Sequence, residues 1–194
     1  MYAGHAAIAL IIKARNRDVP MLPLVLACYG PDFLDILLMI PAPRPGTGPY
    51  SHSIPAVLLG GAIAAGLYAF FARRPGALAI FIGWIVHWPA DAFTGVKPVT
   101  DLDSSIGFDL YHHFYADFAL EALLTGLACW LYWRSLGREP QHRRPIIVLA
   151  AVLLALQAGF DVTLSELERE PESVSLAHRG GETHFPSHHP TPAA

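Results

Sequence analysis

The stretch from residue 53 to residue 72 contains no charged side chain, and it constrains the fold more than any other feature of this chain. It reads "SIPAVLLGGAIAAGLYAFFA", and its 20 residues match the length of a helix that crosses about 30 Å of hydrocarbon. Only 15% of the 194 residues are charged, whereas soluble domains carry roughly 25% charged residues. We therefore expect a chain that folds in a lipid bilayer.

Further apolar segments predict an all-α, multi-pass membrane bundle with five to six membrane-embedded helices. These segments cover about residues 2–14, 19–41, 77–96, 116–134 and 145–164. The first is short for a span and is expected to lie partly embedded, and prolines interrupt the second. Residues 1–164 are thus expected to form the membrane-embedded domain. Residues 165–194 are polar and rich in proline, which predicts a disordered C-terminal tail.

The basic residues are concentrated in alternate loops. Nine of them lie in the loops after the first, third and fifth segments: Lys13, Arg15, Arg17, Arg73, Arg74, Arg134, Arg138, Arg143 and Arg144. The other loops carry only Arg44 and Lys97. By the positive-inside rule the nine face the cytoplasm and the other face points outward. In a bacterial host this predicts the cytoplasmic (inner) membrane and a periplasmic outer face, and a net charge of −3 gives no reason to expect a nucleic-acid partner.

Residues able to bind metal converge on the outward side of four apolar segments. They are His5, Asp32, Asp35, His52, His87 and Asp91. His87 and Asp91 are four residues apart and share a helical face, as do Asp32 and Asp35 at a spacing of three. Neutral imidazole and carboxylate are ligands of zinc, manganese and iron. A divalent cation also relieves the repulsion between neighbouring buried carboxylates.

These residues predict a divalent metal site, with zinc as the first choice and manganese or iron as alternatives. We expect the ligands to be His5, Asp32, His52, His87 and Asp91. Structural interpretations also exist, because intramembrane histidines often form hydrogen bonds between helices. Asp32 could cap a helix that restarts after a proline, and His52 could cap the segment that follows it.

A second polar group lies on the same outward side. Asp117 and Glu121 are four residues apart near the start of the fifth segment, after His112 and His113. We expect the two carboxylates to support the metal site or to face a substrate. The histidines of the tail are interpreted as inert or as weak metal binders: His178, His184, His188 and His189.

Four short motifs resemble a known family when they are taken in order. "GHAAIA", "PDFLD", "YSHS" and "HWPADAFTG" within residues 1–98 resemble the motifs of the YdjM-like membrane proteins, a family of membrane-bound, metal-dependent hydrolases. A more distant likeness is to zinc-dependent phospholipase C, an all-helical enzyme that hydrolyses phosphodiesters at a metal cluster. The resemblance implies the five metal ligands given above, with Thr94 as their supporting partner.

The chain departs from the family pattern at two motifs. The family's P-D-x-D-H motif has Leu34 in place of its second aspartate here, and Asp35 in place of its histidine. Thr47 stands where the family often has a histidine before its T-H-S motif. A smaller ligand set implies one metal ion rather than two, or a member that has lost catalysis.

The sequence therefore predicts a metal-dependent hydrolase that acts on a lipid or lipid-linked (phospho)ester. Asp35 or Glu121 would serve as the general base for a metal-activated water. Two alternatives remain open: an ion or proton transporter, and a scaffold held by a structural metal or a polar seam. The inward halves of the segments contain no acidic residues, which favours a one-sided site over a transport pathway. The oligomeric state is not encoded in any pattern that we recognise.

Overall fold

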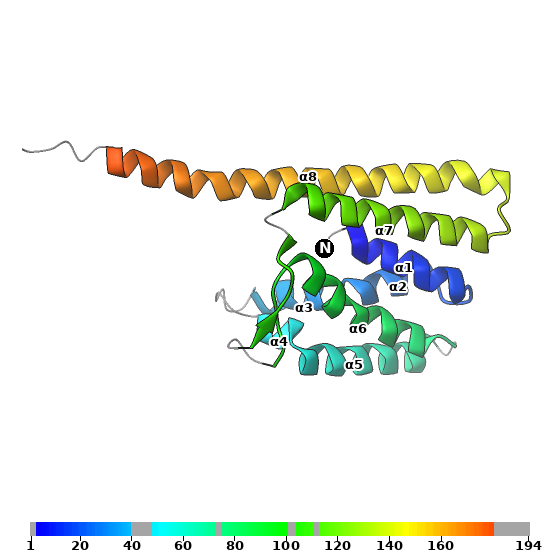
Figure 1. Cartoon of the computed structure of the whole chain (residues 1–194). Helices are drawn as coiled ribbons and strands as arrows, with labels where there is room; N and C mark the ends of the chain where they lie inside the picture. Colours follow the sequence, from blue (N-terminus) through cyan, green and yellow to red (C-terminus); the bar gives the residue numbers. More distant parts are fainter. Residues whose placement is uncertain (1–2, 40–47, 73–74, 101–103, 111–112, 181–194) are drawn as a thin grey trace, which may run out of the picture. The chain divides into compact units, whose positions relative to one another are not determined.

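The computed structural model describes residues 3–39, 48–72, 75–100, 104–110 and 113–180. The described chain is helical apart from one two-stranded hairpin, which confirms the predicted all-α class (Figure 1). The elements are α1 (Ala3–Arg15), α2 (Met21–Cys28), α3 (Gly30–Met39), α4 (Gly48–His52), α5 (Ile54–Ala72), α6 (Ala77–Thr94), β1 (Lys97–Pro98), β2 (Ser105–Ile106), α7 (Phe114–Ser135) and α8 (Pro140–Gly180).

Within the described residues, four helices are long and apolar enough to cross a membrane. They are α5, α6, α7 and the part of α8 from Pro140 to Thr163. The pair formed by α2 and α3 is bent by 58° and makes a fifth candidate if it counts as one broken span. The prolines that interrupt this segment explain the break, because a proline lacks the amide hydrogen that a continuous helix needs. Helix α1 has 13 residues and is shorter than a span.

The distribution of polarity is the reverse of that in a soluble protein. Large apolar side chains are exposed on the outer helices, including Leu59 (64% exposed), Phe71 (74%) and Val148 (61%). Polar side chains are buried instead, and Glu121 and Gln157 are fully covered. Extensive exposed apolar surface normally marks contact with a membrane or a partner, and polar groups inside a membrane bundle face its interior.

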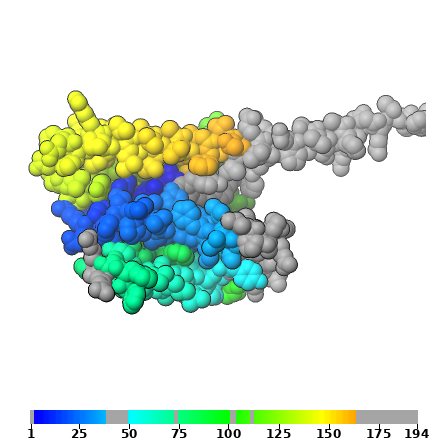
Figure 2. Space-filling view, turned by 180° about the vertical axis from the view of Figure 1, so that it is seen from behind, coloured from blue at the N-terminus to red at the C-terminus, as the bar shows by residue number. Residues whose placement is uncertain are grey.

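Residues up to Asp161 form one compact unit, with α1 and α2 in its middle. Helix α1 packs against α7, α2 and α6, and α6 in turn packs against α5. Figure 2 shows α1 and α2 as a blue band between α8 on one side and α5 on the other. Because α1 is central, any side chain at its start lies inside the bundle, which is where His5 is found.

Helix α8 extends past residue 165, where the composition predicts the start of a disordered tail. Residues from Val162 onward belong to a second unit, and they are helical as far as Gly180. The sequence "SELERE" at this point consists mostly of residues with high helix propensity. His184, His188 and His189 lie outside the described residues, as do His112 and Thr47.

Trp84 of α6 fills the space between two other helices. Its indole lies against Gly30 at the start of α3 and against Gly60 in α5, and a Cβ atom at either glycine would overlap the ring. Gly66, two turns further along α5, faces open space. The small-residue run "LLGGAIAAG" therefore provides a packing surface within the chain at Gly60.

We expect Gly60→Ala to destabilise the protein and Gly66→Ala to leave it unchanged or slightly more stable. Alanine gains up to about 1 kcal/mol over glycine from helix propensity, whereas overpacking costs about 1–3 kcal/mol. Thermal unfolding of both variants in detergent measures the difference. Equal unfolding temperatures for the two variants would contradict the packing of Trp84 against α5.

Candidate metal centre

The break between α2 and α3 determines how His87 is oriented. The break leaves the carbonyl of Cys28, the last residue of α2, without a helical partner, and Nδ1 of His87 lies 2.8 Å from it. A carbonyl oxygen can only accept, so Nδ1 carries the hydrogen. In the neutral ring the lone pair is then on Nε2, the atom that faces the carboxylates of Asp32 and Asp91 at 3.4 Å each.

His52 is oriented by a chain of two hydrogen bonds. The Ser51 hydroxyl donates to Oδ1 of Asp35 at 2.8 Å, so its oxygen is left to accept from Nδ1 of His52 at 2.7 Å. Nε2 of His52 therefore also presents its lone pair, in this case to Oδ1 of Asp32 at 3.2 Å. Such partners of the far ring nitrogen are typical of metal-binding histidines.

Four ligand atoms gather at one point between α3, α4 and α6. Asp32, His52, His87 and Asp91 each offer one atom, and all four atoms lie within 4.8 Å of one another. Nε2 of His52 lies 3.2 Å from Nε2 of His87 and 3.7 Å from Oδ2 of Asp91. A tetrahedral zinc ion with bonds of about 2.0–2.1 Å separates its ligand atoms by about 3.3–3.4 Å. The group thus has the composition and spacing that could hold a metal ion.

Local sequence explains why these side chains meet. Asp32 lies in the first turn of α3, where the helix dipole favours a carboxylate. His52 is the last residue of α4, and Ser53 rather than His52 accepts an amide of α5, from Ala56 at 3.4 Å. His87 and Asp91 project from the same face of α6, on either side of Pro89.

Lys97 joins the group, although the sequence analysis treated it only as a loop charge. Its Nζ lies 2.7 Å from Oδ2 of Asp91, the same oxygen that faces the two histidines. The β1–β2 hairpin holds it there, since the Trp88 indole donates to the carbonyl of Pro98 at 3.0 Å. One feature of the sequence could have indicated this contact: Lys97 follows Asp91 by six residues and lies just beyond the end of α6.

His5 lies beside the four-residue group rather than within it. Its Nε2 is 3.5 Å from Oδ1 of Asp91, the oxygen turned away from the other histidines, and its ring contacts that of His87 at a centroid distance of 4.0 Å. The side chain is fully buried, and neither ring nitrogen has a hydrogen-bond partner in the described part of the chain. Buried polar atoms are normally satisfied, so this imidazole has unused binding capacity.

The second polar group holds the start of α1. Glu121 accepts the amide hydrogen of Gly4 at 2.8 Å, and Gln157 accepts that of Ala3 at 3.1 Å. Gln157 also donates to Asp161 at 2.7 Å and to Asp117 at 3.5 Å. These contacts satisfy amides that have no partner within α1 and so fix the position of His5, one residue further along. Gln157 and Asp161 were missed, although they have the same four-residue spacing in an apolar run as His87 and Asp91.

The remaining predicted residues have other surroundings. Asp35 is linked to His52 of the group through the hydroxyl of Ser51. The Thr94 hydroxyl is directed at the carbonyl of Asp91, 3.4 Å away in its own helix. His113 immediately precedes α7 and is exposed.

The surface near the group is apolar and aromatic. Asp32 is its most exposed member, with 40% of the side chain accessible, compared with 6% for His52 and 4% for Asp91. Its neighbour Phe33 is half exposed, and Phe93 near the end of α6 stacks on exposed Phe108 at 5.5 Å. A ligand that reaches the group past Asp32 therefore meets apolar side chains.

Two variants test whether the hydrogen bond from Gly4 to Glu121 stabilises the protein. Glu121→Gln keeps an oxygen that can accept the Gly4 amide, so we expect a stability close to that of the wild type. Glu121→Leu leaves this amide unsatisfied and should cost about 1–3 kcal/mol. Thermal unfolding in detergent tests this, and equal losses in both variants would show that the negative charge, not the hydrogen bond, is required.

No protein-family model, curated protein or solved structure matches this chain. The chemistry of the group therefore has to be derived from its own side chains.

Proposed function

We propose that this chain is an integral membrane protein with an outward-facing metal centre that hydrolyses a lipid or lipid-linked (phospho)ester. One divalent ion, zinc in the first instance, would be held by Asp32, His52, His87 and Asp91. His5 would complete or support this ligand set next to Oδ1 of Asp91. We count five membrane spans in this proposal. Helices α2 and α3 together form one broken span, and α1 is embedded among the others.

The facing lone pairs of His52 and His87 carry the proposal. The Nδ1 hydrogens of these rings are directed at Ser51 and at the carbonyl of Cys28, and the two Nε2 atoms lie 3.2 Å apart with carboxylate oxygens around them. Neutral imidazoles in this arrangement repel each other unless a cation or a proton lies between them. A divalent ion satisfies both nitrogens and both carboxylates at once.

The membrane location supports a lipid substrate. The loops at the other end of the helices hold the nine basic residues, so the positive-inside rule directs the His/Asp group outward. The exposed aromatic side chains Phe33, Phe93 and Phe108 lie near the group at this outer end. An amphipathic molecule could place its acyl part against these rings and its ester at Asp32. The resemblance to the YdjM-like hydrolases points to the same reaction class.

Each residue would have a distinct role in hydrolysis. A bound ion supplies Lewis acidity and lowers the pKa of a water molecule. Asp32, the accessible carboxylate, could bind the ion through one oxygen and take a proton from the attacking water with the other. The Lys97 ammonium beside Asp91 can pair with a phosphoryl oxygen of the substrate. Asp35 would act through Ser51 by holding His52 in its ligand tautomer, which revises the base role expected from sequence.

A structural polar seam is the second candidate, and the Lys97–Asp91 pair favours it. This contact at 2.7 Å already supplies a cation to the buried carboxylate. A bundle could use it to join the hairpin to α6 without any metal ion.

Metal content should distinguish the two candidates. We expect near-stoichiometric zinc, manganese or iron in the detergent-purified protein, and its loss in His52→Ala and His87→Asn. Ser51→Ala should weaken metal binding by about 10–100-fold, because it removes the partner that orients His52. Asp35→Asn should retain it, since the amide oxygen can still accept from Ser51. Elemental analysis and metal titration provide the measurements.

His113→Ala is the matched control, because this histidine is exposed and lies outside the group. Wild-type protein that stays metal-free after metal is added back would exclude the metal centre. Metal-loaded protein should cleave phosphodiester or carboxylester lipids in a screen, and loaded protein without any such activity would leave the metal as structural.

Lys97→Met tests whether the ion pair or the metal holds the group together. With metal bound, we expect an unfolding temperature near that of wild type, because the metal ion still neutralises Asp91. After chelation the variant should lose about 3 kcal/mol relative to chelated wild type, since Asp91 is then a buried charge without its partner. Thermal unfolding with and without chelator gives both values. An equal loss in both conditions would favour the polar seam.

A further inference from the structure

We propose that the end of the bundle opposite the His/Asp group binds an anionic phospholipid in the groove between α7 and α8, with the lipid phosphate at Arg143. This site is separate from the metal centre. Its lining residues lie near the end of α7 and the start of α8, whereas Asp117 and Glu121 occupy the first turns of α7. From Glu121 to Trp133 the helix rises about 18 Å.

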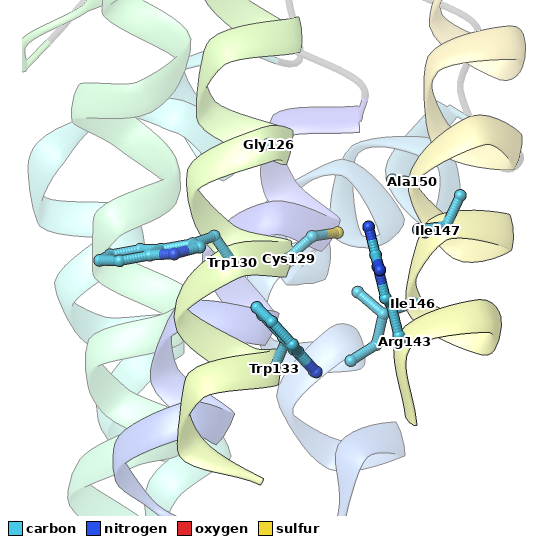
Figure 3. Close-up of a pocket in the computed structure, with 8 residues that line it drawn as sticks. All are labelled: Gly126, Cys129, Trp130, Trp133, Arg143, Ile146, Ile147 and Ala150. Atoms are coloured by element: carbon cyan, nitrogen blue, oxygen red, sulfur yellow. The ribbon is translucent and has the colours of Figure 1, made fainter. Parts of the chain in front are cut away.

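The groove contains a cavity of about 340 Å³, within the range of roughly 300–1,000 Å³ that is usual for ligand sites. Figure 3 shows its walls, formed by Gly126, Cys129 and Trp133 on α7 and by Ile146 and Ala150 on α8. Apart from Arg143 and the two indoles, the lining is apolar. Nearby Ile147 is 55% exposed, so the groove is continuous with the outer apolar surface of α8. Such walls suit an acyl chain.

The groove is lined by two hydrogen-bond donors, an exposed guanidinium and a buried indole N–H. The guanidinium of Arg143 reaches into the gap between the helices (Figure 3), and among the described residues no carboxylate lies within ion-pair distance of it. Nε1 of Trp133 is buried and has no hydrogen-bond partner in the same part of the chain. A buried N–H group without an acceptor is uncommon, so it indicates a missing ligand atom. A phosphate oxygen can accept from the guanidinium, and the indole N–H is a second donor from a residue that lines the same groove.

A second cavity at the same end strengthens the charge argument. It measures about 200 Å³, lies between α1 and α7, and is lined by Arg15 and Arg134 with Ile11 and Leu131. Arg134 also lies over the Trp130 ring, 5.3 Å from its centroid. Both cavities thus combine arginine with apolar walls next to the basic loops. Basic pockets between helices on the cytoplasmic side favour anionic headgroups, and a zwitterionic headgroup would bring an ammonium close to these arginines.

Lipid retention by the purified full-length protein tests the proposal. We expect native mass spectrometry to show that wild type retains dioleoyl phosphatidylglycerol about fivefold more strongly than dioleoyl phosphatidylcholine, as one arginine near a lipid headgroup predicts. Arg143→Gln should abolish this preference and leave the retention of phosphatidylcholine unchanged. Gly126→Leu should reduce retention of both lipids, because Gly126 faces open space and a leucine there fills the groove without a clash.

Arg144→Gln is the matched control, since Arg144 is exposed beside Arg143 but does not line the cavity. It should behave as wild type. Equal retention of the two lipids by wild type would overturn the proposal, and so would an equal loss in Arg144→Gln, which would indicate diffuse surface charge. If Arg143→Gln fails to fold, Trp133→Phe removes only the indole donor, which the phosphate of either lipid can use, and should lower the retention of both lipids. Unchanged retention of both lipids in Trp133→Phe would then count against the site.

Discussion

The hydrogen bond from His87 to the carbonyl of Cys28 is the contact on which the geometry of the site depends. It exists because α2 ends at Cys28, which frees a carbonyl inside an apolar bundle where water cannot satisfy it. The same break restarts the chain as α3 and brings Asp32 to the group in the first turn. One interruption of the helix thus supplies both a member of the His/Asp group and the acceptor that orients another member.

The start of α1 is also held by hydrogen bonds to side chains of other helices. In an apolar environment its first amides need acceptors, and Glu121 and Gln157 provide them from α7 and α8. His5 follows directly after these capped residues and faces Oδ1 of Asp91, whereas His87 faces Oδ2. The polar side chains of α7 and α8 therefore affect the metal group through the backbone of α1, without having to touch a metal ion.

Sequence patterns located the group because charges are rare in apolar segments and their spacing identifies a shared face. These patterns predicted that Asp32, His52, His87 and Asp91 lie together, with His5 as a fifth ligand. The structure groups the first four and has His5 beside them. The patterns assigned Asp35 as a candidate general base but could not show that its carboxylate accepts from a hydroxyl sixteen residues away, at Ser51. Lys97 was missed for a similar reason: a loop lysine looks like surface charge until the hairpin is seen to direct it at Asp91. Contacts made through a loop or a shared hydroxyl leave no periodic signal.

The charge balance of the group bears on the substrate. Two carboxylates and the Lys97 ammonium leave the group with one negative charge while its histidines are neutral, which would repel a phosphoester. A bound divalent ion reverses the sign to one positive charge, and most of it would lie in a buried environment where it is poorly screened. The loaded centre would therefore attract an anionic headgroup, and the metal-free centre would not. Metal binding would then control substrate binding as well as chemistry, so the two functions would be gained or lost together.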